Sequence, residues 1–304
     1  GLVQNTRMIA RIQQTVVFLL LASLGAWSWY VSPDYSRVFF GFLAMVGAYI
    51  AYVAILFIVI HYLNRNDPQP RSTLWALFQA FVREACTAPT VFLWRQPFRT
   101  QAISDALQPS NKAGVVFIHG FFCNRAFWSP WMAQLQSQNR AFASVTLEPA
   151  FGSIDDYAAI VEAAVVKVTQ ATGQAPTLIC HSMGGLAARA WLRSNTANDS
   201  RVKRIITIGT PHFGTALSTE KALLPFINTH QMQRLGAWTT QLAKDEPAGR
   251  YAKFTCWYSN CDNIVVPTST AMLPDSDNRL VTAEGHVSMA FNAQVMQKSL
   301  ALLD

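Results

Sequence analysis

The feature that most constrains this sequence is an abrupt change from a short buried strand to a helix at a single serine. Residues 176–180 form a short apolar run, which is typical of a buried strand. Small residues follow Ser182, and a helical pattern begins at once and covers residues 186–192. A turn of this kind lifts the serine hydroxyl above the carboxyl end of a parallel sheet. The sequence therefore makes Ser182 a candidate nucleophile.

The turn departs from the usual pattern Gly-x-Ser-x-Gly at its first position, where Cys180 replaces glycine. Cysteine is small, so we expect the strand and the helix still to pack closely. In such a turn the backbone N–H of the next residue, here Met183, can stabilise a negatively charged oxygen. An ordinary strand-to-helix turn without chemistry is the alternative for this motif alone.

A serine hydroxyl needs a histidine base, and the histidine needs an acid that orients it. Two later residues satisfy this requirement. Asp262 follows the predicted strand 253–258, and His286 follows the predicted strand 279–282. The chain order serine, aspartate, histidine is the order of an α/β-hydrolase, so we predict a triad of Ser182, Asp262 and His286.

Other titratable residues fit these roles less well. His181 adjoins the serine and must point elsewhere. His119 and His212 lie in loops that contain glycine, where holding the loop by hydrogen bonds is the simpler role. Asp275 and Asp277 compete with Asp262 for the role of acid, but they lie in a polar loop that no strand immediately precedes.

A second oxyanion donor is expected from the loop after an earlier strand. The apolar run 114–118 is followed by His119, Gly120 and Phe121. Glycine allows the sharp turn that would aim the next amide inward. We therefore predict that the backbone N–H of Phe121 pairs with that of Met183.

Six short apolar runs alternate with helical patterns in the last two thirds of the chain. They lie near residues 114–118, 141–147, 176–180, 203–208, 253–258 and 279–282. This alternation predicts an α/β fold over residues 112–304, with a mostly parallel sheet covered by helices on both faces. Residues 215–251 are long for a connection and rich in leucine and aromatic residues, so we expect a helical lid or a static cap there.

Five segments carry a family resemblance: HGFFCNRAFW, CHSMGG, TIGTPHFGT, SNCDNIVVP and GHVSMAFN. Together they resemble bacterial triacylglycerol lipases and esterases of the α/β-hydrolase superfamily, over residues 112–304. The resemblance implies that Ser182, Asp262 and His286 form the triad and that Phe121 and Met183 supply the oxyanion donors. It also implies hydrolysis of a lipid or other acyl ester through an acyl-enzyme, without a cofactor. An acyltransferase with the same triad, and a membrane scaffold with a weak site, are the alternatives.

The N-terminal part of the chain is much more apolar than the rest. Residues 12–31 contain no charged residue, and residues 38–63 contain no ionisable group except His61 and tyrosines. At about 1.5 Å per residue, each segment is long enough to cross a hydrocarbon core of about 30 Å. We therefore predict a transmembrane hairpin over residues 1–66. A cleaved signal peptide explains the first segment less well, because no convincing cleavage site precedes the second.

Basic residues indicate the orientation of this hairpin. Five arginines flank its two outer ends and one lies in the turn: Arg7, Arg11, Arg65, Arg71 and Arg83, against Arg37. By the positive-inside rule this favours a cytoplasmic catalytic domain, on a bacterial inner membrane if the family resemblance holds.

Residues 67–111 are predicted to link the hairpin to the catalytic domain. Apolar residues at helical spacing over 74–85 predict one amphipathic helix, limited afterwards by Pro89 and Pro97. This helix would either lie on the bilayer surface or pack on the catalytic domain.

The remaining composition narrows the expected partners. The net charge of +7 fits attraction to anionic lipids, and no basic and aromatic motif supports nucleic-acid binding. The five cysteines show no metal-binding spacing, so no metal is expected. Cys256 and Cys261 could form a disulfide or remain free thiols. Protein partners are not predicted.

Overall fold

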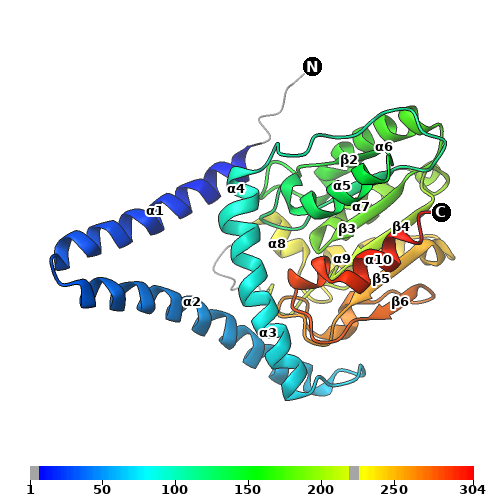
Figure 1. Cartoon of the computed structure of the whole chain (residues 1–304). Helices are drawn as coiled ribbons and strands as arrows, with labels where there is room; N and C mark the ends of the chain where they lie inside the picture. Colours follow the sequence, from blue (N-terminus) through cyan, green and yellow to red (C-terminus); the bar gives the residue numbers. More distant parts are fainter. Residues whose placement is uncertain (1–6, 219–225) are drawn as a thin grey trace.

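The structure is a computed structural model that describes residues 7–218 and 226–304. Residues 219–225, which belong to the predicted lid, lie outside the described residues. An α/β domain occupies the larger part of the chain, and a helical hairpin projects from it (Figure 1). A long helix, α3 continued by α4, runs between the hairpin and the domain.

The α/β domain contains a six-stranded sheet in which all neighbouring strands are parallel. The strands follow the order β2-β1-β3-β4-β5-β6 across the sheet. In chain order they are β1 (Val115–Ile118), β2 (Phe142–Ser144), β3 (Thr177–His181), β4 (Arg204–Ile208), β5 (Phe254–Tyr258) and β6 (Asp277–Leu280). Each coincides with a predicted strand to within three residues at either end. The α/β-hydrolase fold is confirmed.

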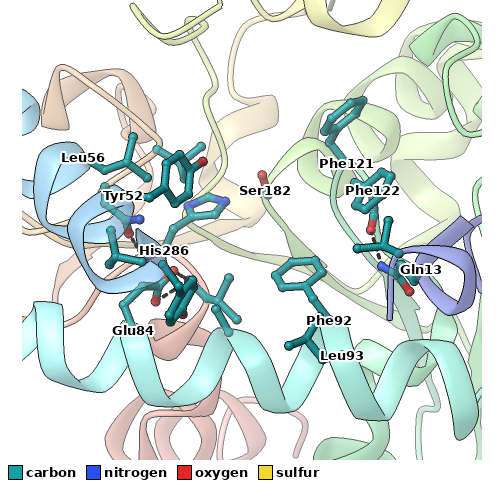
Figure 2. A pocket seen from close by; sticks show the side chains of 17 residues that line it. Gln13, Tyr52, Leu56, Glu84, Phe92, Leu93, Phe121, Phe122, Ser182 and His286 are labelled. Carbon is teal, nitrogen blue, oxygen red and sulfur yellow. Dashed lines mark hydrogen bonds between the residues drawn. The ribbon is translucent and has the colours of Figure 1, made fainter. Parts of the chain in front are cut away.

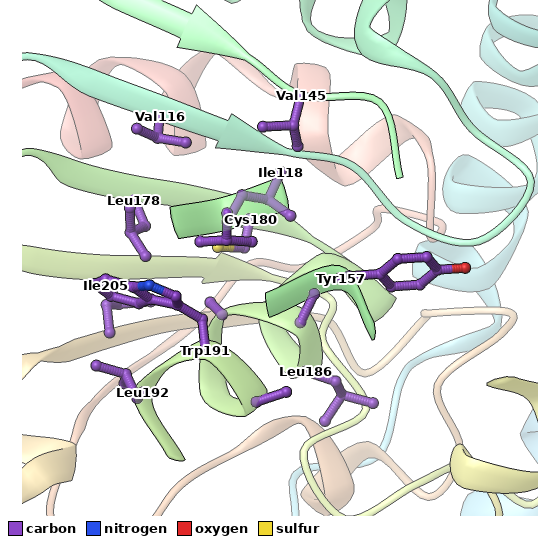
Figure 3. Packing of buried hydrophobic residues seen from close by; sticks show 14 of the residues in the cluster. Val116, Ile118, Val145, Tyr157, Leu178, Cys180, Leu186, Trp191, Leu192 and Ile205 are labelled. Atoms are coloured by element: carbon purple, nitrogen blue, oxygen red, sulfur yellow. The ribbon is translucent and has the colours of Figure 1, made fainter. Parts of the chain in front are cut away.

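Successive side chains of a strand point to opposite faces of the sheet, so an apolar strand presents apolar side chains on both faces. Helices cover both faces. The covering helices are α5 (Ser129–Ser137), α6 (Ala158–Thr172), α7 (Met183–Ser194) and α10 (Ala293–Leu300). Val116 and Ile118 pack with side chains of α6 and α7, in the cluster shown in Figure 3. Val115 and Phe117 pack on the other face with side chains of α5 and α10. All four strand residues are completely buried.

The hairpin consists of α1 (Met8–Val31) and α2 (Tyr35–Leu63). Both helices are long and apolar enough to cross a membrane, and only 17% of either apolar window is buried. They are therefore not core helices of the α/β domain. Near the turn, the Trp27 indole donates a hydrogen bond to the Arg37 carbonyl at 2.9 Å and joins the two helices.

The predicted linker helix is longer than expected. It comprises α3 (Leu74–Pro89), a π-helical segment η2 (Thr90–Arg95) and a short α4 (Gln96–Phe98) without a break. Our expectation that the helix would end before its first proline was wrong.

The helix continues past Pro89 because a side chain of another helix donates to the backbone carbonyl that proline leaves without a donor. A proline cannot donate to the carbonyl four residues earlier, which here belongs to Ala85. The Tyr49 hydroxyl of α2 donates to that carbonyl at 3.0 Å. A long-range contact therefore replaces the missing helical hydrogen bond.

The two faces of α3 have different surroundings. Leu77, Ala80 and Glu84 are buried against α2 and the α/β domain. Leu74 and Trp75, by contrast, are 76% and 66% exposed. The helix therefore packs on the domain and also presents an exposed apolar stripe, and its placement on a bilayer surface stays a prediction.

The described part of the predicted lid is helical, with α8 (Ile227–Gln231) and α9 (Ala237–Asp245). Met232 and Leu242 join the core cluster that contains α7. Phe226 stacks on Phe151 in the connection after β2, with ring centroids 4.0 Å apart, and its ring centroid lies 6.4 Å from that of Phe121 in the loop after β1. The described part of this segment therefore packs on the α/β domain through a few buried side chains.

Candidate active site

Ser182 lies in a strained turn between β3 and α7. Its φ of 53° and ψ of −129° belong to a region that residues other than glycine rarely occupy. The turn is held from both sides, because Ser182 N donates to Ile208 O at 2.9 Å and Thr210 Oγ1 donates to Ser182 O at 2.9 Å. The end of β4 (Arg204–Ile208) and the loop directly after it thus fix the backbone that carries the hydroxyl.

Close packing explains which residues the turn requires. A Cβ at Gly184 would lie 2.3 Å from the Ile118 carbonyl oxygen, so only glycine fits there. Cys180 is completely buried in the core cluster with side chains of α7. The cysteine at the first position of the motif is thus accommodated, as expected.

The structure brings Asp262 and His286 together at the carboxyl edge of the sheet. His286 Nδ1 lies 2.9 Å from Asp262 Oδ2 and 3.1 Å from Oδ1. The carboxylate is itself fixed, because the amides of Ile264 and Val265 each donate to Asp262 Oδ1 at 2.8 Å. Both side chains are buried.

The surroundings of His286 favour its protonated form. Burial opposes the charge, but the negative charge and hydrogen bond of Asp262, with a smaller effect of Glu84, raise the pKa of His286 above its ordinary value. The backbone of His286 is also held. Its N–H donates to Asn263 Oδ1 at 2.9 Å, and its carbonyl accepts from His181 Nε2 at 3.0 Å. His181 points away from the serine, as predicted, and supports the histidine loop.

Sequence reasoning missed a second carboxylate beside this pair. Glu84 of α3 is buried and accepts three hydrogen bonds from the amides that follow His286. Val287 N donates to both carboxylate oxygens at 3.0 Å, and Ser288 N donates to Oε2 at 2.8 Å. Burial raises the pKa of Glu84, and these donors oppose the rise. Because both oxygens accept N–H groups, the contacts are those of a carboxylate.

A second contact joins α3 to the same loop. Arg83 pairs with Glu284 at 2.6 Å, and Glu284 also accepts from Ser288 Oγ at 2.7 Å and Asn292 Nδ2 at 2.8 Å. The only sequence feature that could have indicated these partners is an adjacent arginine and glutamate on an otherwise apolar helix. Helix α3 therefore holds the loop of His286 through two neighbouring side chains.

The predicted oxyanion donors lie beside the serine turn. Gly120 approaches so closely that a Cβ there would lie 2.7 Å from Ser182 Cβ. Among the described residues, the amides of Phe121 and Met183 donate to no protein group. His119 holds this loop, as predicted: Nδ1 lies 2.8 Å from Gly120 O, and burial lowers its pKa to about 4.

Helix α1 also reaches the loop after β1. The Gln13 side chain donates to the Phe122 carbonyl at 3.1 Å, and Gln13 is only 2% exposed. Phe122 itself has a positive φ of 56°. A residue of the first apolar helix thus supports the loop that carries a predicted oxyanion donor.

A cavity of about 400 Å³ connects these groups (Figure 2). Ser182 and His286 lie on its inner wall, and Phe121 and Phe122 lie on one side of it. The remaining lining residues come mainly from the hairpin and the long helix: Gln13, Val16, Tyr49, Tyr52, Val53, Leu56, Glu84, Ala88, Phe92 and Leu93. None of the described residues of segment 215–251 lines it. Among the described residues, the roof over Ser182 is therefore formed by the hairpin and the long helix.

The other candidates lie outside this arrangement. Asp277 belongs to β6 and pairs with Arg279, so it is not placed to orient His286. Cys256 and Cys261 are both free thiols. Within residues 7–218 and 226–304, no cluster of three potential metal ligands was found.

Comparison with known proteins agrees with this architecture. The sequence matches the alpha/beta hydrolase family over residues 115–293, more than half of the chain. Comparison with curated protein sequences gave no match. The fold is similar to the mature form of Bacillus licheniformis lipase BlEst2, with 19% identity, a TM-score of 0.56, and coverage of 64% of this chain and 94% of that chain. It is also similar to Aspergillus fumigatus lipase B, with 17% identity, a TM-score of 0.58, and coverage of 66% and 54%.

At these identities the likeness to the two lipases concerns the fold alone. The family match is independent of that likeness, and it extends from β1 to the start of α10. Three of the observations above rest on segments inside it: the strained serine turn, the aspartate after β5 and the histidine after β6. The chain therefore belongs to the alpha/beta hydrolase family.

Proposed function

We propose that this protein is a membrane-anchored serine hydrolase of carboxylic esters, with lipids as its natural substrates. The observation that carries the proposal is the shared cavity, in which a strained serine and a carboxylate-bound histidine face an apolar space. The lipase names of the two structural neighbours agree with this choice of reaction.

In the proposed reaction His286 accepts the proton of Ser182 Oγ while that oxygen attacks the ester carbonyl. Asp262 holds the imidazole so that Nε2 faces the serine. The amides of Phe121 and Met183 stabilise the resulting oxyanion. His286 then returns the proton to the departing alcohol, and water hydrolyses the acyl-enzyme by the same steps. Ser182 Oγ makes no hydrogen bond among the described residues, and such contacts often tighten only when substrate binds.

Anchoring by α1 and α2 is part of the same proposal. Both helices are largely uncovered, and their exposed surface carries phenylalanine, leucine and isoleucine side chains. Exposing apolar surfaces of this length to water is unfavourable, whereas the hydrocarbon core of a bilayer accommodates them. A cytoplasmic catalytic domain is proposed from the arginines that flank the hairpin.

The proposal is tested by assaying full-length protein in vesicles against a panel of p-nitrophenyl esters, glycerides and phospholipids. We expect Ser182→Ala to remain folded and to lose at least 1000-fold in rate. Ser137→Ala, at an exposed serine of α5, is the matched control and should retain activity. Hydrolysis by Ser182→Ala at the wild-type rate would refute the proposed nucleophile, and hydrolysis of short soluble esters only would refute the lipid assignment.

A further inference from the structure

The roof of the cavity is formed in part by α1 and α2, and both helices are largely exposed. Val16 of α1 and Tyr52 of α2 both line the cavity, yet they remain 43% and 61% exposed. A side chain can do both only at the rim of an opening. The cavity above Ser182 therefore opens outward where the two apolar helices diverge from each other toward the domain (Figures 1 and 2).

The depth of this opening follows from helix geometry. Fifteen residues separate Val16 from Val31 at the turn, and seventeen separate Tyr35 at the turn from Tyr52. With a rise of about 1.5 Å per residue, both rim residues lie roughly 23–26 Å from the turn. If the turn lies at the far surface of a hydrocarbon core of about 30 Å, both rim residues lie just inside the near surface.

Ester groups of glycerolipids lie at that same level, at the boundary between head groups and acyl chains. The wall below the catalytic pair is apolar, with Val53, Leu56, Phe92 and Leu93 contributing to it. A cavity of this size is in the range of small-ligand pockets, and an apolar wall suits a hydrocarbon chain. An acyl chain could thus pass from the bilayer to Ser182 without crossing water.

We propose that the opening between α1 and α2 is an entry site for ester-linked acyl chains of glycerolipids from the near leaflet, with Val16 and Tyr52 forming its rim and Leu56 lining the wall next to it. The hairpin is then part of the substrate site and not only an anchor. This inference rests on the proposed function, because it names the substrate of the same serine.

The test uses full-length protein in dioleoylphosphatidylcholine vesicles that also contain phosphatidylglycerol and diacylglycerol. Val16→Trp and, independently, Leu56→Trp place a large side chain in the entry. Each buried methylene changes affinity about fourfold, so loss of two methylene contacts lowers the ratio of kcat/KM for p-nitrophenyl palmitate over p-nitrophenyl acetate about 15-fold. The matched control is Val46→Trp on α2, at a residue that is 39% exposed and does not line the cavity. It should leave the ratio unchanged.

The outcomes separate this inference from the proposed function. Wild-type protein should release fatty acid from the vesicles, and Val16→Trp should release it more slowly. An unchanged ratio in both tryptophan variants, or hydrolysis of p-nitrophenyl acetate without any fatty-acid release, would overturn the entry site and leave the serine hydrolase intact. A wild-type protein that hydrolyses neither ester nor lipid would instead refute the proposed function.

Discussion

Replacing Glu84 with glutamine tests how strongly helix α3 controls the catalytic histidine. The carboxylate accepts three backbone hydrogen bonds from the two residues after His286. Glutamine offers one oxygen, and its NH₂ group would face one of these N–H donors. Losing one hydrogen bond to a charged group costs about 1.5–3 kcal/mol of unfolding free energy. A displacement of the histidine loop by about 1 Å would lower kcat on the order of 100-fold.

The same substitution also has a defined effect on pH dependence. Glu84 contributes to raising the pKa of His286, so its removal lowers that pKa. The base must be neutral to accept the serine proton, and a lower pKa keeps it neutral at lower pH. We therefore expect the acidic limb of the pH profile of kcat/KM to move to lower pH in Glu84→Gln. A purely structural role would reduce the rate without moving this limb.

Two further variants complete this experiment. Glu84→Asp keeps the charge but is shorter, so it should lose rate while its acidic limb stays closer to that of the wild type. Glu162→Gln removes a carboxylate that binds Arg201 and Trp191 far from the cavity, and it should not move the limb. Thermal unfolding followed by circular dichroism establishes that each variant is folded. The reasoning is wrong if folded Glu84→Gln shows an unchanged limb or one shifted to higher pH.

Two other substitutions test the packing argument. Gly184→Ala should abolish folded, active protein, because its Cβ would lie 2.3 Å from the last carbonyl oxygen of β1. The control Gly25→Ala, whose Cβ would meet nothing within 4 Å, should be tolerated. Normal expression and activity of Gly184→Ala would contradict this argument. Tyr49→Phe should lower the free energy of unfolding by about 1 kcal/mol, because the Ala85 carbonyl loses its donor. The control Tyr35→Phe, at an 85% exposed residue, should leave it unchanged. Equal melting temperatures of Tyr49→Phe and the wild type would show that this hydrogen bond does not stabilise the fold.

The sheet and the serine turn could be predicted because local sequence determines them. Except for β6, which reads Asp-Asn-Arg-Leu, each strand is a short and mainly apolar run. The order of Ser182, Asp262 and His286 along the chain follows the order of the strands that carry them. The hydrogen bond between the aspartate and the histidine then results from two loops that end at the same edge of the sheet. The positions of Asp262 and His286 after their strands are therefore enough to predict that the two side chains meet.

The roof and the support of the histidine could not be predicted, because they depend on contacts between distant segments. Glu84 binds amides about 200 residues away, and within its own helix it resembles an ordinary polar position. Pro89 interrupts the helical pattern, and the Tyr49 hydroxyl from a distant segment donates to the Ala85 carbonyl in place of the missing N–H. Residues 215–251 were predicted to cover the serine from their composition. Among the described residues, the cavity is instead lined by α1, α2, α3 and η2 together with loops of the α/β domain.

The most direct test of the account is covalent labelling of the nucleophile. Full-length protein in vesicles is treated with a fluorophosphonate, digested, and examined by mass spectrometry. We predict one phosphonyl adduct, located on Ser182, and no adduct in Ser182→Ala, while Ser137→Ala is labelled as in the wild type. An adduct on another residue, or labelling that persists in Ser182→Ala, would contradict the assignment of Ser182 as the nucleophile.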